Sequence, residues 1–357
     1  MNAAVSPIGR KHNALWALSV VRIKLFLREP GSLFWVFVFP LLITVALGAA
    51  FRTQGPPRNA VAVVAGPTAN ATATALAGDP ALKVEILEAG EAARRLRTGE
   101  AVLAVDAPAT PGGPVTFRYD PSRPEAAGVR RLADDVLQAH AGRRDPLSTR
   151  DETAVVRGAR YVDWMVPGLL GMQLLNGAMW GAAFNIVNAR QRKLLKRLAA
   201  TPMRRGYYLL SYRVSGLLFV PLQFFVLFGF ARLAFGVVIQ GSVLAALALA
   251  LLGSWSFAGL GLLCAARAQN SETANGLINL VTLPMLVLSG VFFSASKFPH
   301  AIQPVIRLLP LTAFNDALRH VVNDGASIFA QGFPLAVLVG WGAITTALAL
   351  RLFRWTS

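Results

Sequence analysis

The sequence predicts a helical polytopic membrane protein with six transmembrane helices and one inserted extracytoplasmic α/β domain. Of its 357 residues, 54% are hydrophobic and only 15% are charged, and the mean hydropathy is +0.50. Soluble domains usually carry about 25% charged residues, so this composition excludes a disordered chain and disfavours an ordinary soluble enzyme. Long uncharged runs flank one stretch of mixed composition, residues 52–163. That stretch is long enough to form a modest core of its own.

The first uncharged run, residues 31–51, has 21 residues, about the number that crosses a hydrocarbon core. Because a basic region of 30 residues precedes it, we interpret it as a span rather than as a cleaved signal peptide. Five more apolar runs follow, at residues 164–189, 207–231, 243–266, 274–293 and 333–350. Prolines within four of the six runs are compatible with a bundle, where neighbouring helices satisfy the freed backbone groups.

The net charge of +17 is divided unequally between the two sides that six spans define. Residues 1–30, 190–213, 265–273 and 351–357 share the side of the termini and hold 16 basic residues but only two acidic ones. The short segments of the other side hold four basic residues, Arg232, Lys297, Arg307 and Arg319. Positive charge favours the cytoplasmic side, so we expect both termini in the cytoplasm. The basic excess therefore indicates orientation and gives no support to nucleic-acid binding.

Residues 52–163 form the predicted extracytoplasmic domain. Short apolar segments that suggest strands occur at residues 61–65, 83–87, 102–106 and 115–119. Segments with helical spacing of apolar residues occur at 68–76, 89–98 and 125–139. Strands alternating with helices favour a small α/β domain. The single cysteine of the chain, Cys264, excludes an internal disulfide.

Motifs for catalysis are absent from the sequence. No lysine follows a glycine, so the chain has no phosphate-binding G-x-x-x-x-G-K-[ST] loop. The four histidines are far apart, without the spacing of metal ligands. We therefore expect no catalytic and no metal-binding residues, and we expect any energy source to lie on another chain.

Two cytoplasmic segments have amphipathic character. Within residues 1–30, the stretch 14–28 has three leucines and a valine at helical spacing together with three basic residues, which suggests a helix on the membrane surface, or simply a basic anchor. Residues 190–201 combine leucines with basic side chains and end at Thr201-Pro202. In this loop, apolar leucines are surrounded by basic side chains. This pattern suits contact with a partner protein or with anionic lipid, and the basic residues alone would also fix the topology.

Residues 283–322, between the fifth and sixth spans, are too apolar for a free loop. Prolines 299, 304 and 310 divide them into pieces too short to cross a bilayer. Such pieces suggest re-entrant helices buried in protein, here residues 294–322. Asp316 and Arg319 are three residues apart and can pair on one helix face.

In this order around six spans, these segments resemble the type-2 permease family of ATP-binding-cassette (ABC) exporters, in its longer, multidrug-exporter-like branch. The runs LLKRLAATPM (194–203) and LPMLVLSGVFF…DALR (283–319) carry the resemblance most specifically. In the family the first is the coupling helix that docks on the ATPase, and the second is the pair of re-entrant helices near the outer exit. The family's acidic E-R-x-x-G-T lead-in is replaced here by Ala189, Gln191, Lys193 and Leu194.

The resemblance implies two sets of site residues. The coupling set is Arg192, Lys193, Leu194, Leu195, Lys196, Arg197, Leu198, Thr201 and Pro202. The exit set is Pro284, Ser289, Gly290, Pro299, Pro310, Asp316 and Arg319. A third set rests on spacing alone, since Asn275, Asn279 and Thr282 of the fifth span and Gln173 and Asn176 of the second form polar stripes. These stripes suggest helix–helix hydrogen bonds, a substrate path or a dimer seam.

We therefore expect the permease subunit of an ATP-driven exporter in the bacterial cytoplasmic membrane, moving an amphipathic or hydrophobic substrate outward. The resemblance implies a homodimer or a paralogous permease partner, and an ABC ATPase subunit that carries ATP and Mg²⁺, with no cofactor on this chain. Membrane lipids are the other expected contact. The alternative is a membrane receptor or anchoring protein whose extracytoplasmic domain binds a ligand.

Overall fold

The computed structural model describes residues 14–50, 58–110, 113–143, 160–200 and 205–353. Contacts between residues divide the chain into two compact units, residues 53–154 and the remainder, and we describe each by itself. The first unit ends before the predicted boundary at residue 163, because Tyr161 already begins a helix of the second unit.

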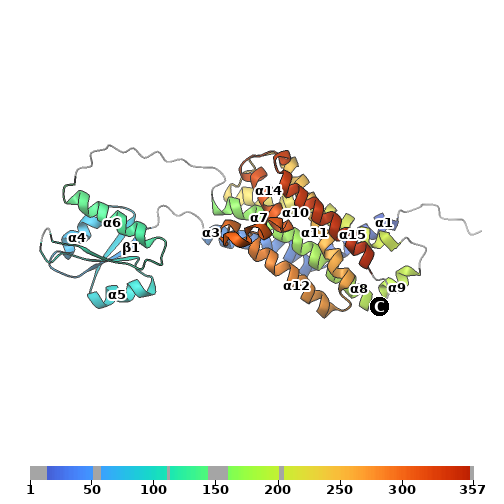
Figure 1. The fold of residues 1–357 in the computed structure, drawn as a ribbon, viewed down its shortest axis with the longest axis horizontal. Coiled ribbons are helices and arrows are strands. Elements are labelled where there is room, and N and C mark those ends of the chain that lie inside the picture. The colour runs from blue at the N-terminus through green and yellow to red at the C-terminus, as the bar shows by residue number, and fades with distance from the viewer. Residues whose placement is uncertain (1–13, 51–57, 111–112, 144–159, 201–204, 354–357) are drawn as a thin grey trace, which may run out of the picture. The chain divides into compact units, whose positions relative to one another are not determined.

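The first unit is a four-stranded sheet with helices on both faces (Figure 1). Its strand order is β2-β1-β3-β4, with β1 (Asn59–Val64) parallel to β2 (Leu82–Leu87) and β3 (Leu103–Asp106), and β4 (Thr116–Arg118) antiparallel to β3. Helices α4 (Ala69–Ala77) and α6 (Ala126–His140) pack on the face of Val61 and Val63, and α5 (Ala89–Thr98) packs on that of Ala62. The central strand β1 is apolar throughout after its first residue because both of its faces are covered.

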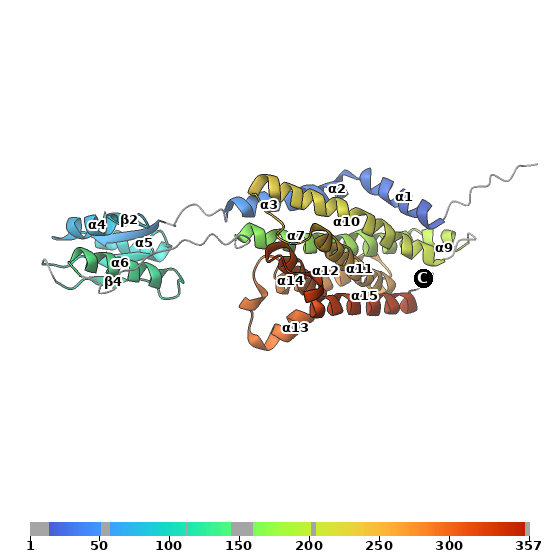
Figure 2. The ribbon, with the colours of Figure 1, turned by 90° about the horizontal axis from the view of Figure 1, so that it is seen from above.

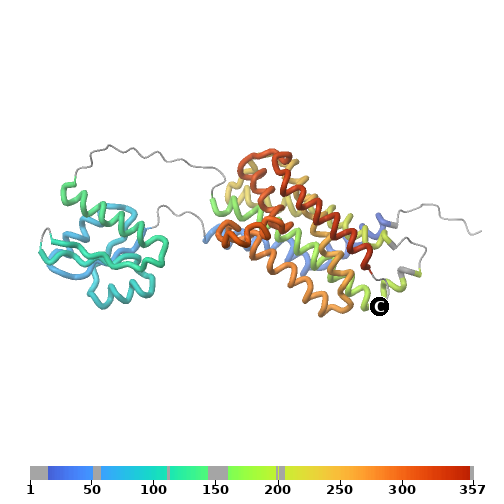
Figure 3. The backbone as a smooth tube through the Cα atoms, viewed as in Figure 1, coloured from blue at the N-terminus to red at the C-terminus, as the bar shows by residue number. Residues whose placement is uncertain are grey.

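The regular elements among the described residues of the second unit, named the helical unit below, are all helices. Its longer elements are α1 (Ala14–Leu27), α3 (Phe39–Ala50), α7 (Tyr161–Asn176), α8 (Asn185–Gln191), α10 (Arg205–Phe235), α11 (Val243–Arg267), α12 (Ser271–Leu288), α14 (Pro310–Asn323) and α15 (Gly332–Leu352). Short helices are α2 (Pro30–Leu33), α9 (Leu194–Ala199), α13 (Gln303–Leu308) and the 3-10 turns Ala295–Lys297, His300–Ile302 and Ile328–Ala330. Two π-helical segments, η1 (Phe34–Val38) and η2 (Gly177–Phe184), connect α2 to α3 and α7 to α8. Figure 3 shows the unbroken path from α7 into α8.

Four of the described helices are long and apolar enough to cross a bilayer: Pro30–Ala50, Gly206–Phe235, Val243–Arg267 and Gly332–Leu352. The predicted second span is the continuous α7–η2–α8 helix, and the predicted fifth span is α12, which contains Glu272 and two asparagines. A total of six spans therefore stays a prediction. Helix α12 begins at Ser271, earlier than predicted, because the Asn270 side chain caps it by accepting from Thr273 N at 2.7 Å.

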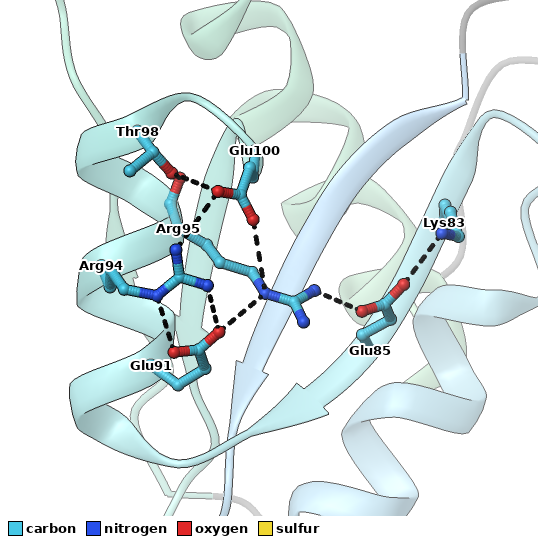
Figure 4. A network of polar contacts seen from close by, with 7 residues as sticks. All are labelled: Lys83, Glu85, Glu91, Arg94, Arg95, Thr98 and Glu100. Atoms are coloured by element: carbon cyan, nitrogen blue, oxygen red, sulfur yellow. Dashed lines mark hydrogen bonds and ion pairs between the residues drawn. The ribbon is translucent and has the colours of Figure 1, made fainter.

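A network of ion pairs joins α5 to the edge strand β2 in the first unit, named the soluble unit below (Figure 4). Glu91 accepts from both Arg94 and Arg95, and Arg95 also reaches Glu85 at 2.5 Å. These hydrogen bonds from Arg94 and Arg95 lower the pKa of Glu91 to about 2. Because the pKa is lower in the folded state, ionised Glu91 stabilises the unit at pH values above its pKa in the unfolded chain. This contribution is lost as the pH falls toward 2.

Glu91→Gln should lower the protection of α5 amides against hydrogen exchange at pH 7. The difference from wild type should shrink below about pH 4.3, the ordinary value for a glutamate, and vanish near pH 2. Ala93→Gln, an exposed change within α5 that leaves the ion pairs intact, is the control and should leave protection nearly unchanged at every pH. A Glu91 effect independent of pH would contradict this account.

Candidate functional site

The chain turns sharply between α8 and α9, in the segment that was expected to couple to an ATPase. Lys193 adopts a left-handed backbone conformation with φ of +58°, among described residues the only one other than glycine with positive φ. This conformation costs a side-chain-bearing residue about 1–2 kcal/mol relative to glycine. Lys193 stands where the family's E-R-x-x-G-T lead-in has its glycine, with Arg190 matching the arginine.

The expected helix over residues 190–201 is shorter in the structure, because Arg190 and Gln191 belong to α8 and are held by neighbouring helices. Arg190 is buried, and its Nη1 donates to the carbonyl of Ala265 at 3.0 Å and to that of Ala268. Its guanidinium also lies 5.1 Å from the centre of the Phe353 ring. The cation thus satisfies carbonyls at the end of α11, where the helix dipole is negative. Gln191 accepts from Ser271 Oγ at 2.7 Å.

The leucines of α9 have different environments. Leu195 is 1% exposed and packs in the helical core, whereas Leu194 is 44% exposed. The basic members of the expected coupling set are all exposed, and none forms an ion pair with another described residue: Arg192, Lys193, Lys196 and Arg197. Thr201, Pro202 and the side chain of Leu198 lie outside the described residues. Leu195 was expected in the coupling set, but its side chain fills the core of this chain and is not part of the exposed surface of α9.

A further cation connects α1 to α10, the helix that follows this loop. The Arg22 guanidinium lies 3.1 Å from the ring centre of Tyr212 and 4.8 Å from that of Tyr208. Its Nε donates to Ser211 Oγ at 2.8 Å. Cation–π contacts of this kind are worth about 0.5–2 kcal/mol. The sequence offered only the i, i+4 tyrosine pair as a signal, and nothing indicated its partner.

The expected exit set gathers at the end of the helical unit where α7 begins. Helix α12 contains Pro284 and stops at Leu288, because Gly290 takes φ of +68°, which a glycine adopts without strain. The buried Ser289 accepts at its carbonyl from Asn315 Nδ2 of α14 at 3.0 Å. Pro299 precedes a 3-10 turn and Pro310 opens α14 at a position where proline is tolerated.

Arg319 of α14 connects the start of α7 to the end of α12. Its Nε donates to the Trp164 carbonyl at 3.1 Å, its Nη2 donates to the Gly290 carbonyl at 2.5 Å, and its guanidinium lies 3.9 Å from the centre of the Trp164 ring. The pair expected with Asp316 is present but long, with Nη1 at 3.8 Å from the carboxylate. Arg319 therefore binds the start of α7 and the end of α12 more closely than it binds Asp316.

The polar stripes separate in the structure. Gln173 is buried and donates to the Val36 carbonyl in the π-helical segment of the first span, which supports the helix–helix interpretation for this residue. Thr282 is also buried, and Asn275 and Asn176 are half-buried. Asn279 is exposed. The described residues contain no group of three or more His, Cys, Asp or Glu that could hold a metal ion.

Lys193→Gly should raise the stability of the chain by about 0.5–1 kcal/mol, because removal of the left-handed strain exceeds the added freedom of the unfolded chain. Lys193→Val should lower stability, since a β-branched residue tolerates positive φ least. Thermal unfolding in detergent measures both changes. Equal changes in stability from the two substitutions would contradict backbone strain at Lys193.

Comparison with known proteins gives one family. The ABC-2 family transporter protein model matches residues 30–351, which contain all of the first unit and most of the second. Relatives include the linearmycin resistance permease protein LnrN of Bacillus subtilis, 26% identical over 49% of this chain and 46% of its own length. The daunorubicin resistance ABC transporter permease protein DrrB1 of Streptomyces coeruleorubidus is 29% identical over 28% of this chain and 34% of its own. The probable multidrug ABC transporter permease YbhR of Escherichia coli is 21% identical over 54% and 53%.

The chain spans about a third to about half of the length of these relatives. The family match is broader, since it runs from the start of the first apolar helix to the end of the last one. Together with the apolar helices it shows that the chain is a multi-pass membrane protein that belongs to the ABC-2 family of transporter permeases.

Proposed function

We propose that the chain is the permease subunit of an ATP-driven exporter that moves an amphipathic or hydrophobic substrate outward. The observation that carries the proposal is the α9 surface, formed by Arg192, Lys193, Leu194, Lys196 and Arg197. These side chains are exposed on α9 and on the two-residue turn that precedes it, with no acidic partner among the described residues. A cationic surface around one apolar side chain suits a docking partner with an acidic groove.

The contacts around α9 support transmission of force from such a partner. Arg190 and Gln191 connect the base of α9 to the end of α11 and the start of α12. Arg22 connects α10, which follows the loop, to α1. A push on α9 by a closing ATPase pair would then move several helices together. Both termini lie in the cytoplasm in this proposal, and the soluble unit lies outside.

Leu194→Asp should abolish capture of the ATPase that co-purifies with the tagged wild-type chain, because it places a carboxylate in the docking surface. Arg351→Glu, which reverses an exposed cation at the end of α15, is the control and should leave capture intact. Leu195→Ala should instead lower thermal stability by about 2–5 kcal/mol, as expected for a cavity in the core. Capture and transport by Leu194→Asp at wild-type levels would refute docking at α9.

A second copy or a paralogue is proposed to pack on the exposed face of α12. Gly276, Leu280, Leu283 and Val287 recur at helical spacing, and the last three are 70%, 57% and 63% exposed. Asn279 borders this face, and an intramembrane amide gains most from a partner across a helix interface. The first span exposes a comparable stripe at Trp35, Val38, Leu42 and Val45, while Pro40, Thr44 and Gly48 face the bundle.

Asn279→Cys should give a cross-linked dimer in native membranes with a short bis-maleimide, because the single native thiol, Cys264, is buried. Adding Gly276→Trp should remove the dimer, since the bulky ring blocks close approach of the two helices. Ala347→Cys, exposed on α15, serves as the control and should stay monomeric. Equal cross-linking from both cysteines would contradict a seam at α12.

A further inference from the structure

A cavity of about 440 Å³ lies beside α14, at the end of the helical unit where α7 begins. Trp164, Thr312, Asp316, Arg319 and Asn323 contribute to its lining. A second cavity of about 400 Å³ adjoins it and shares Gln303 and Arg307. Figure 2 shows α13, which carries both shared residues, at the edge of the helical unit.

Two buried oxygens lie behind the lining of the first cavity. The hydroxyl of Thr312, a residue 1% exposed, and the Asn323 Oδ1 have no hydrogen-bond partner among the described residues. Neither oxygen has an exposed surface, so a ligand in the cavity does not contact them directly. The exposed charged side chains of the lining therefore determine which ligand the cavity suits.

The Asp316 carboxylate adds negative charge to this lining. It is 46% exposed, and its nearest cation, Arg319 Nη1, is 3.8 Å away. Arg319 directs two of its other nitrogens to the Trp164 and Gly290 carbonyls. The second carboxylate of the lining, that of Asp324, is hydrogen-bonded to His320 Nδ1 at 2.8 Å. Asp316 is therefore the carboxylate available to a cationic donor group.

The second cavity supplies positive charge and then apolar surface. Arg307 is exposed and forms no ion pair with a described residue. Beyond it the cavity is lined by Pro304, Leu308 and Phe333. Leu308 and Phe333 are 53% and 57% exposed. A carboxylate, a cation and an apolar wall thus follow one another along the two cavities.

We propose that these cavities bind a phospholipid with a primary ammonium headgroup, of the phosphatidylethanolamine type. Its ammonium donates to Asp316, its phosphate pairs with Arg307, and an acyl chain lies along Leu308 and Phe333. An anionic headgroup would bring no cation to Asp316, and a choline headgroup has no N–H to donate. The proposal requires only that the helical unit lies in a bilayer, so it stands or falls independently of export.

The test is lipid binding to the full chain in nanodiscs or detergent, measured by native mass spectrometry. The probes are phosphatidylethanolamine, phosphatidylcholine and phosphatidylglycerol with identical acyl chains. Phosphatidylethanolamine should bind about tenfold more tightly than phosphatidylcholine, as expected for one charge-assisted hydrogen-bond set. Asp316→Asn should remove this preference, and Arg307→Gln should weaken binding of all three phospholipids.

Two controls separate the site from general effects. Asp324→Asn changes a lining carboxylate that is already paired, and Lys297→Gln removes an exposed cation outside both cavities, so neither should alter the preference. No preference in the wild-type chain, or a preference that survives Asp316→Asn, would overturn the proposal. Tighter binding of phosphatidylglycerol would also overturn it. If Asp316→Asn does not fold, the wild-type comparison and Arg307→Gln still decide the outcome.

Discussion

The helical unit depends on the burial of α14, a helix of 14 residues that is too short to cross a bilayer. A helix in this position must have its polar groups satisfied by protein, since hydrocarbon offers no partners. Close approach to α7 and α11 makes this possible, because Gly171 and Gly253 leave room where a Cβ would meet the Phe314 ring. Asn315 and Arg319 then reach the carbonyls that end α12 and begin α7. The bundle, the end of α12 and the two cavities follow from this packing.

Much of the fold was predictable, because apolar runs and strand–helix alternation are local properties of the chain. The strands and helices of the soluble unit lie within a residue or two of their predicted positions. The site was less predictable, because exposure depends on which helices meet. Leu194 and Leu195 are adjacent residues of the same type, yet only Leu194 is exposed. The polar stripe on α12 likewise separates into a buried Thr282 and an exposed Asn279, according to where the neighbouring helices lie.

The arginines of the helical unit fall into two groups, those bonded within the chain and those that stay exposed. A count of charges does not distinguish the two groups. Arg22, Arg190 and Arg319 use their guanidinium groups on carbonyls, a hydroxyl and aromatic rings within the chain. Arg192 and Arg197 remain exposed on either side of the bend at Lys193. Arginines in the helical unit thus cap helices, stack on aromatic rings or stay exposed, with different residues in each role.

The π-helical segment η2 accommodates an extra residue without turning the helix that follows it. Each residue of an α-helix turns the chain by about 100°, whereas a π-helical turn holds about one residue more than an α-helical turn. A chain with one residue fewer between Gly177 and Phe184 would therefore form an ordinary α-helix there, and Arg190 would still face the carbonyls of α11. The same deletion within the α-helical residues 185–189 would turn that guanidinium away from α11 by about 100°.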